Sequence, residues 1–282
     1  MKITVNKEPK NTYKIEVIVP KEKVAEYLDE ALHHEAENVE IKGFRKGKAP
    51  INLVKEQLGI DKLRSHALNH LLPEIYKQII NENKINPIIN PRFDLKKFVE
   101  NEDLELMVVL VERPEIKIND YVSGLKKKYS EKKEDLTNEE VVEVILSNSI
   151  VDVSNVLIEE ETDRMMTSLL EQTEKMGITL DKYLEAVKKS PEEVRAEYIE
   201  IAEKSLKGDF ALTEIAIKED YTVSDEEIEE TIKAVPDDKS REELRKPEQK
   251  YYIKAVLTKG KTLAKLAEIA KNVENNSKKE EK

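Results

Sequence analysis

The chain has 282 residues, a net charge of −11 and 38% charged side chains, so it is longer than one typical domain and unusually rich in polar surface. It contains no cysteine, which excludes disulfides, thiolate metal sites and cysteine nucleophiles. No targeting signal is evident at the N-terminus, and no apolar run approaches the roughly 18 residues that a membrane span requires. The sequence therefore predicts a cytoplasmic protein with no membrane partner.

The net charge is unevenly distributed along the chain. Residues 1–118 contain 20 basic and 20 acidic side chains, whereas residues 119–282 contain 28 basic and 39 acidic ones and therefore carry the whole net charge. Such a change in charge balance predicts two units with different electrostatic properties.

Residues 1–118 show the pattern of an α+β domain. Apolar and polar residues alternate over residues 13–19 and again over 104–110, which predicts two half-buried strands. Between these strands, apolar side chains recur at the spacing of a helix. Helices are predicted over residues 24–39, 51–58 and 61–83.

The remainder of the chain is predicted to be a linker, a helical domain and a tail. Residues 119–135 have charges in blocks and almost no apolar periodicity, which is typical of a linker. Residues 136–271 have helical spacing throughout, and the polar residues 272–282 are predicted to be disordered. The longer predicted helices cover residues 155–176, 180–188, 191–219 and 248–271, with short ones near residues 225 and 241.

Four capping boxes mark where helices of this second part are expected to begin. In each box a hydroxyl side chain caps the helix, and a glutamate three residues later binds back to the backbone of the capping residue. The boxes pair Thr137 with Glu140, Ser190 with Glu193, Ser224 with Glu227, and Ser240 with Glu243.

The predicted helix over residues 155–176 carries a long apolar stripe that contains three of the five methionines. Its members are Val156, Leu157, Met165, Met166, Leu169, Leu170 and Met176. Core packing is the ordinary interpretation of such a stripe. The alternative is a surface that adapts to many partners, because the unbranched methionine side chain repacks easily.

Motifs for catalysis and for cofactors are absent from the sequence. There is no GxSxG, no phosphate-binding glycine loop and no HExxH motif, so no enzyme activity and no cofactor are predicted. His66 and His70 have the spacing of a two-histidine metal site, but Ala67 replaces the glutamate and the sequence suggests no third ligand. His33 and His34 are adjacent and point to different sides of their helix, so no metal site is predicted.

The stretch GFRKGKAP at residues 43–50 contains two of only seven glycines and lies in a segment with no acidic residue between Glu40 and Glu56. Gly43 and Gly47 allow positive φ angles, which would display the intervening residues at the tip of a loop. An exposed Phe44 would lose about 2 kcal/mol of favourable burial, which makes a pocket on another molecule attractive. The residues alone leave two interpretations open: docking to an external partner, and a basic turn whose phenylalanine packs on its own helices.

The same stretch resembles the G-F-R-x-G-x-x-P signature of the trigger factor family of ribosome-associated chaperones. Residues 68–76, LNHLLPEIY, and residues 111–116, VERPEI, resemble later parts of that family's N-terminal domain. Residues 158–161, 180–184, 190–195 and 221–228 resemble, more weakly, its helical chaperone domain.

The resemblance implies an α+β N-terminal ribosome-binding domain followed by an all-α, elongated helical-arm chaperone domain. It implies docking on the large ribosomal subunit near the exit tunnel, ATP-independent shielding of nascent or unfolded polypeptides, and a homodimer when free. The residues implied to bind the ribosome are Gly43, Phe44, Arg45, Lys46, Gly47, Lys48 and Pro50. The residues implied to contact client polypeptides are Met165, Met166, Leu169, Leu170 and Met176.

One departure from the family pattern is large. Members usually carry a peptidyl-prolyl isomerase domain of roughly a hundred residues between the two parts, whereas here only residues 119–135 separate them. Isomerase activity is therefore expected to be absent. A ribosome-independent holdase and an RNA- or protein-binding module are the alternative functions.

Overall fold

The computed structural model describes residues 1–272, which divide into two compact units, one ending at Arg113 and the other beginning at Pro114. Each unit has its own buried apolar side chains. Within the described residues, no helix combines the length and the apolar character that a membrane crossing requires.

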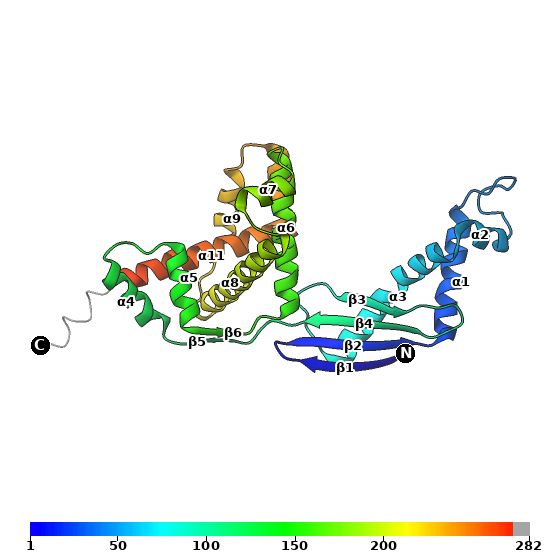
Figure 1. Ribbon diagram of the computed structural model, residues 1–282, viewed down its shortest axis with the longest axis horizontal. Coiled ribbons are helices and arrows are strands. Elements are labelled where there is room, and N and C mark those ends of the chain that lie inside the picture. Colours follow the sequence, from blue (N-terminus) through cyan, green and yellow to red (C-terminus); the bar gives the residue numbers. More distant parts are fainter. Residues whose placement is uncertain (273–282) are drawn as a thin grey trace, which may run out of the picture. The chain divides into compact units, whose positions relative to one another are not determined.

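The first unit is built on a four-stranded antiparallel sheet with the strand order β1-β2-β4-β3. The strands are β1 (Lys2–Glu8), β2 (Thr12–Val19), β3 (Arg92–Lys97) and β4 (Leu104–Val111). Three helices, α1 (Lys21–Asn38), α2 (Ile51–Leu58) and α3 (Ile60–Asn83), lie between β2 and β3 in the chain (Figure 1). The α+β prediction and the three predicted helices are confirmed.

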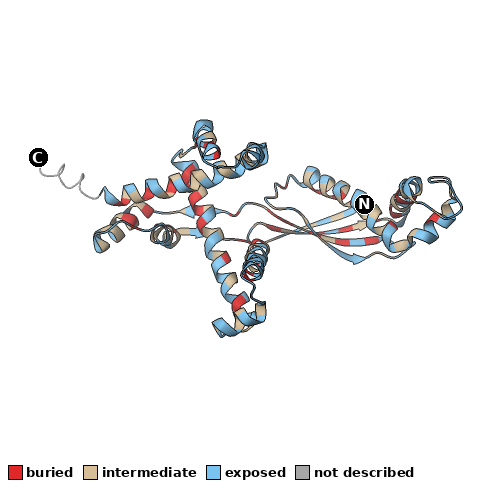
Figure 2. Ribbon diagram, turned by 90° about the horizontal axis from the view of Figure 1, so that it is seen from above, coloured by how far each residue is buried: buried red, intermediate tan, exposed pale blue. Residues whose placement is uncertain are grey.

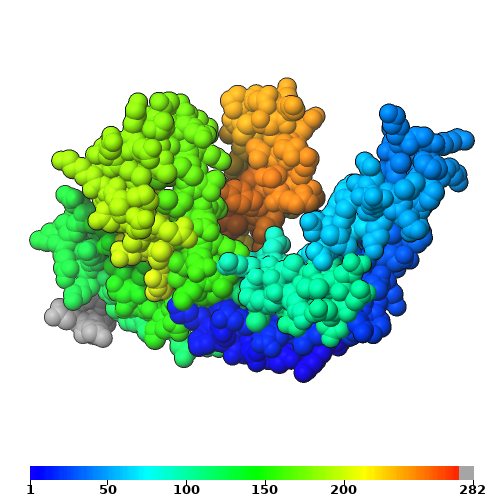
Figure 3. All heavy atoms as spheres, turned by 45° about the vertical axis from the view of Figure 1, so that its right-hand side comes forward, coloured from blue at the N-terminus to red at the C-terminus, as the bar shows by residue number. Residues whose placement is uncertain are grey.

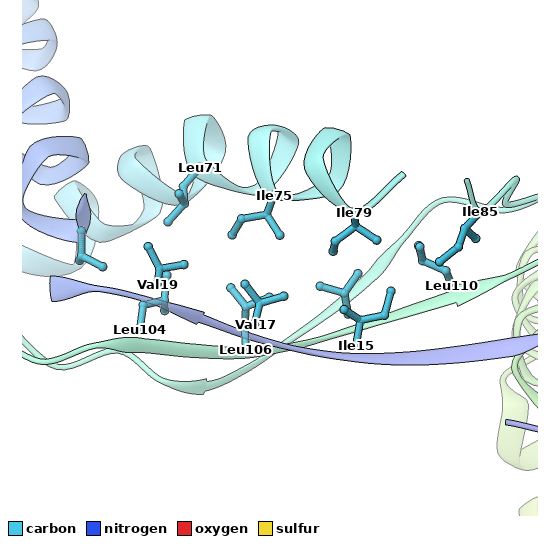
Figure 4. Close-up of a cluster of buried hydrophobic side chains, with 12 residues drawn as sticks. Ile15, Val17, Val19, Leu71, Ile75, Ile79, Ile85, Leu104, Leu106 and Leu110 are labelled. Atoms are coloured by element: carbon cyan, nitrogen blue, oxygen red, sulfur yellow. The ribbon is translucent and has the colours of Figure 1, made fainter. Parts of the chain in front are cut away.

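The main core of this unit lies between α3 and one face of the sheet (Figure 4). Leu71, Ile75 and Ile79 follow one another at intervals of four residues and point from successive turns of α3 toward the strands. Alternate residues of the two central strands face them. These strand residues are Ile15, Val17 and Val19 on β2, and Leu104, Leu106, Val108 and Leu110 on β4.

Alternation reveals the two central strands but not the two strands at the edges of the sheet. Most residues of β1 and β3 are exposed or only partly buried, and Ile3, Val5 and Phe93 pack against the core without being fully buried. An edge strand needs fewer apolar side chains than a central one, so its sequence pattern is weaker.

The second unit begins earlier than expected and contains a small sheet. Strand β5 (Ile116–Ile118) pairs with β6 (Ser149–Val151) in antiparallel fashion, which ties residues 116–118 to this unit. The predicted boundary after Ile118 is therefore wrong, and the unit is largely rather than wholly helical. Strands of three residues are too short to show a period in the sequence.

The prediction of a linker over residues 119–135 is wrong, because residues Tyr121–Lys132 form helix α4. Asp120 caps this helix by accepting a hydrogen bond from the backbone N–H of Ser123 at 3.0 Å. Only Tyr121 and Leu125 are buried on α4, which packs against α11 and α5. Two buried side chains among many lysines leave no recognisable apolar stripe.

The other helices of the second unit follow the predicted order. They are α5 (Asn138–Ser147), α6 (Asn155–Lys175), α7 (Leu180–Val187), α8 (Pro191–Lys218), α9 (Asp225–Lys233), α10 (Asp238–Leu244) and α11 (Pro247–Lys271). Helix α6 packs on α8, and α11 packs on α4, α5 and α8. Their buried residues form narrow stripes, and the rest of each helix is exposed or intermediate (Figure 2).

Three of the four predicted capping boxes are present, at Thr137, Ser190 and Ser224. The box at Ser240 is wrong, because α10 begins three residues earlier and Asp237 caps it, accepting from the Ser240 backbone N–H at 2.7 Å. Apart from Asn272, the predicted disordered tail lies outside the described residues.

Candidate functional site

The segment between α1 and α2 carries the GFRKGKAP stretch and is shaped by two tight turns. The backbone N–H of Phe44 donates to the carbonyl of Ile41 at 3.0 Å, and that of Lys48 donates to the carbonyl of Arg45 at 2.9 Å. Gly43 and Gly47 have φ angles of +92° and +73°, as the sequence predicted. A Cβ at position 47 would also lie 3.3 Å from the backbone oxygen of Glu37. Both the positive φ angle and this close approach therefore favour glycine at position 47.

A small apolar cluster supports the base of this loop. Leu32, Val54 and Leu63, one from each helix, are buried together. Ile41, Ala49 and Ile51, at the two ends of the loop, pack against them. The loop is therefore attached to a packed three-helix junction, and its tip projects from the first unit at the upper right of Figure 3.

The tip, residues 42–48, consists entirely of exposed residues. Phe44 is 43% exposed and belongs to neither apolar cluster of the first unit. None of the basic side chains of Lys42, Arg45, Lys46 and Lys48 forms an ion pair with a described residue. Of the two interpretations of this stretch, the turn packed on its own helices is wrong, and the displayed loop remains.

The apolar residues proposed for client contact lie on α6 or at its end, but the structure separates them. Leu169 is 8% exposed, and Met165 and Met166 are half-buried, as expected for side chains on a helix that packs on α8. Leu170 and Met176 are 40% and 63% exposed. The core interpretation therefore fits the first three residues, and a surface interpretation fits the last two.

Sequence reasoning missed a second set of exposed apolar side chains in the same unit. Tyr251 and Tyr252 on α11 are 79% and 66% exposed, and Ile201 on α8 is 49% exposed. Between α5, α8 and α11 lies an open cavity of about 490 Å³ with Val142, Ile201, Leu212 and Leu263 among its lining residues. No sequence signal separates these residues from core positions, because helical spacing does not show which faces meet a neighbour.

Two family models match the chain with descriptions that agree with this geometry. The model "Bacterial trigger factor protein (TF)" matches residues 1–148, more than half of the chain, and "Bacterial trigger factor protein (TF) C-terminus" matches residues 119–268. The chain belongs to the trigger factor family. No model of a peptidyl-prolyl isomerase domain matches it.

Individual trigger factors are similar over much of this chain. The trigger factor of Staphylococcus carnosus (strain TM300) is 30% identical over 185 residues, which is 66% of this chain and 40% of that protein. The trigger factor of Clostridium botulinum (strain Loch Maree / Type A3) is 28% identical over 244 residues, 86% of this chain and 53% of that protein. The chain thus spans about half the length, or less, of the curated relatives it matches.

A solved structure has the same fold. It is described as "Promiscuous Substrate Recognition in Folding and Assembly Activities of the Trigger Factor Chaperone" and aligns with a TM-score of 0.65 over 95% of this chain and 99% of its own. At 15% identity, this similarity shows a shared fold alone.

Proposed function

We propose that this chain is an ATP-independent cytoplasmic chaperone that docks beside the exit tunnel of the large ribosomal subunit and shields emerging polypeptides. The observation that carries the proposal is the exposed loop of residues 42–50, in which Phe44 and unpaired basic side chains project from a packed helical junction. Membership of the trigger factor family supports the choice of partner.

The chemistry of the loop suits a surface made of RNA and protein. Arg45 and Lys46 can form charge-assisted hydrogen bonds with phosphates or carboxylates. Phe44 gains free energy if a recess on the partner covers its exposed part. The first unit is close to neutral, whereas the rest of the chain is acidic, so phosphate repels the body and attracts the loop.

The second unit provides the surface for clients in this proposal. Leu170 on α6, Met176 at the end of α6, Ile201 on α8 and Tyr251 on α11 are all exposed. Docking keeps this surface close to the emerging chain, and the high effective concentration makes weak apolar contacts sufficient. Weak contacts also permit release without ATP, and no step of the proposal requires catalysis, including prolyl isomerisation.

The test is co-sedimentation with ribosomes at moderate salt. The triple variant Phe44→Ala, Arg45→Ala, Lys46→Ala is expected to bind at least tenfold more weakly than the unchanged chain. A charge-matched control, Lys182→Ala with Lys233→Ala, removes two exposed lysines of the second unit and should bind normally. Equal sedimentation of the triple variant and the unchanged chain would contradict docking through the loop.

A parallel assay distinguishes the alternative functions. Suppression of aggregation of an unfolded client, without ATP and without ribosomes, is expected to be the same for the triple variant and the unchanged chain. If the chain suppresses aggregation but never sediments with ribosomes, it is a ribosome-independent holdase. If it does neither and binds RNA through the loop, it is an RNA-binding module.

A further inference from the structure

Three of the four histidines of the chain gather between α1 and α3. His34 comes from α1, and His66 and His70 come from successive turns of α3. The ring centroids of His34 and His66 are 4.9 Å apart in an edge-on arrangement, and those of His66 and His70 are 5.2 Å apart and stacked. The sequence suggested no third ligand beside His66 and His70, but a different helix, α1, supplies a third imidazole, His34.

The cluster also includes a carboxylate at the position next to His34. His34, Glu35 and His66 each offer one ligand atom, and these atoms all lie within 4.8 Å of one another. Four-coordinate zinc with bonds of about 2.0–2.1 Å places its ligand atoms about 3.4 Å apart. Side-chain rotations that bring the atoms closer together by up to about 1.4 Å are enough to enclose an ion of that size.

Glu35 is held in position by two neighbours. Its Oε2 accepts from Lys62 Nζ at 2.8 Å, and its Oε1 lies 3.0 Å from His66 Nδ1. These two contacts fix the carboxylate of Glu35 beside the ring of His66.

The burial of the cluster favours a defined site with access from solvent. The side chains of His66 and Glu35 are only 14% and 21% exposed, so the surrounding helices restrict their movement. His34 is exposed and leaves the cluster open on one side. Leu32 of α1 and Leu63 of α3 are buried in a shared cluster close to these residues in the chain, which fixes the two helices against each other.

We propose that His34, Glu35 and His66 bind one divalent transition metal ion, with Zn²⁺ as the first candidate and His70 as an adjacent fourth donor. Imidazole with carboxylate suits Zn²⁺, whereas Mg²⁺ and Ca²⁺ prefer sites made of oxygen alone. The ion would link α1 to α3, the two helices that flank the basic loop and α2 in the chain. Neither the proposed docking nor client binding depends on this site.

The test is isothermal titration of the full, untagged chain with Zn²⁺ at neutral pH. We expect one site of micromolar affinity or tighter, and at least a tenfold loss of that affinity in His34→Ala and in His66→Gln. The matched control is His33→Ala, since His33 adjoins His34 but its Nδ1 lies 2.9 Å from the carbonyl of Asp29, outside the cluster. That variant should bind zinc like the unchanged chain.

Cobalt provides a second measurement that does not depend on heat. Co²⁺ bound by these ligands should give the strong visible absorption of a tetrahedral site, which His66→Gln should abolish while circular dichroism remains that of the folded chain. Mg²⁺ should neither bind at micromolar concentration nor displace Co²⁺. Absence of zinc binding at about 100 µM free ion, or equal binding by the His34, His66 and His33 variants, would overturn the proposal.

Discussion

At the scale of single residues, Tyr121 shows how one buried hydroxyl connects two distant parts of the second unit. It is the first residue of α4, it is 4% exposed, and its hydroxyl donates to Glu219 Oε1 at 3.2 Å. Burial, followed by the negative charge of Glu219, raises the pKa of Tyr121 to about 12. The folded unit therefore holds this proton more tightly than the unfolded chain does.

We expect Tyr121→Phe to change how stability depends on alkaline pH. The contribution of the Tyr121 proton is complete below a pH of about 10, where the unfolded tyrosine begins to ionise, and is lost as the pH rises toward 12. Phenylalanine cannot ionise, so the stability advantage of the unchanged chain should shrink by up to about 2–3 kcal/mol over that range.

Urea unfolding followed by circular dichroism at several pH values measures this difference. Tyr251→Phe is the matched control, because Tyr251 is 79% exposed and forms no described hydrogen bond through its hydroxyl. Its stability should run parallel to that of the unchanged chain. If Tyr121→Phe also runs parallel from pH 9 to 12, folding does not raise the pKa of Tyr121 and this account is wrong.

The residues of the site differ in how far sequence could find them. Gly43 and Gly47 signal the loop because their φ angles are a local property that glycine alone satisfies easily. The contacts Tyr121–Glu219 and His34–His66 join positions that are distant in the chain, and nothing in a single sequence indicates that these positions meet. Local geometry is therefore predictable from local sequence, and contacts between elements are not.

At the scale of elements, the junction between α4 and α5 combines a capping box with an ion pair. Glu140 receives hydrogen bonds from the backbone N–H of Thr137 at 2.8 Å and from Lys132 Nζ at 2.8 Å. The bond from Lys132, followed by that from Thr137, lowers the pKa of Glu140 to about 2. The carboxylate thus fastens the end of α4 to the start of α5.

Glu140→Gln is expected to destabilise the second unit at neutral pH and to have less effect in acid. A carboxylate whose pKa is depressed by folding stabilises the fold above its unfolded value of 4.5, and this contribution is lost as the pH falls toward 2. Glu139→Gln changes the neighbouring, mostly exposed carboxylate and serves as the control. Unfolding curves measured at pH 7 and at pH 3 should show a smaller stability difference between Glu140→Gln and the unchanged chain at pH 3. The same difference at both pH values would contradict this account.

Helices and strands were predictable where they are long and have one buried face and one exposed face. The helix over residues 191–218 has a capping box and seven buried positions, so the sequence indicates both where it begins and which face is buried. Helix α4 buries two side chains, and β5 spans three residues, so neither carries a readable period. The edge strands β1 and β3 also show no readable period. They are held to the sheet by backbone hydrogen bonds, which any sequence can form.

At the scale of the whole molecule, the two units have separate cores and separate proposed tasks. The sheet and α3 bury one apolar cluster in residues 1–113, and α9, α10 and α11 share another in the second unit. A unit of this length with its own core is large enough to fold alone. Docking and client shielding are then separable, provided that each task depends on one unit only.

We therefore expect the fragment of residues 1–113 to unfold cooperatively and to compete with the full chain for ribosomes at a similar concentration. Docking in the proposal uses only the loop and the junction of α1, α2 and α3, all within that fragment. The fragment should not suppress aggregation, because Leu170, Met176, Ile201 and Tyr251 lie outside it. The measurement is displacement of the labelled full chain from ribosomes by the unlabelled fragment. The fragment with Phe44→Ala is the control. A folded fragment that fails to compete would show that docking needs the second unit as well, and the division of tasks would be wrong.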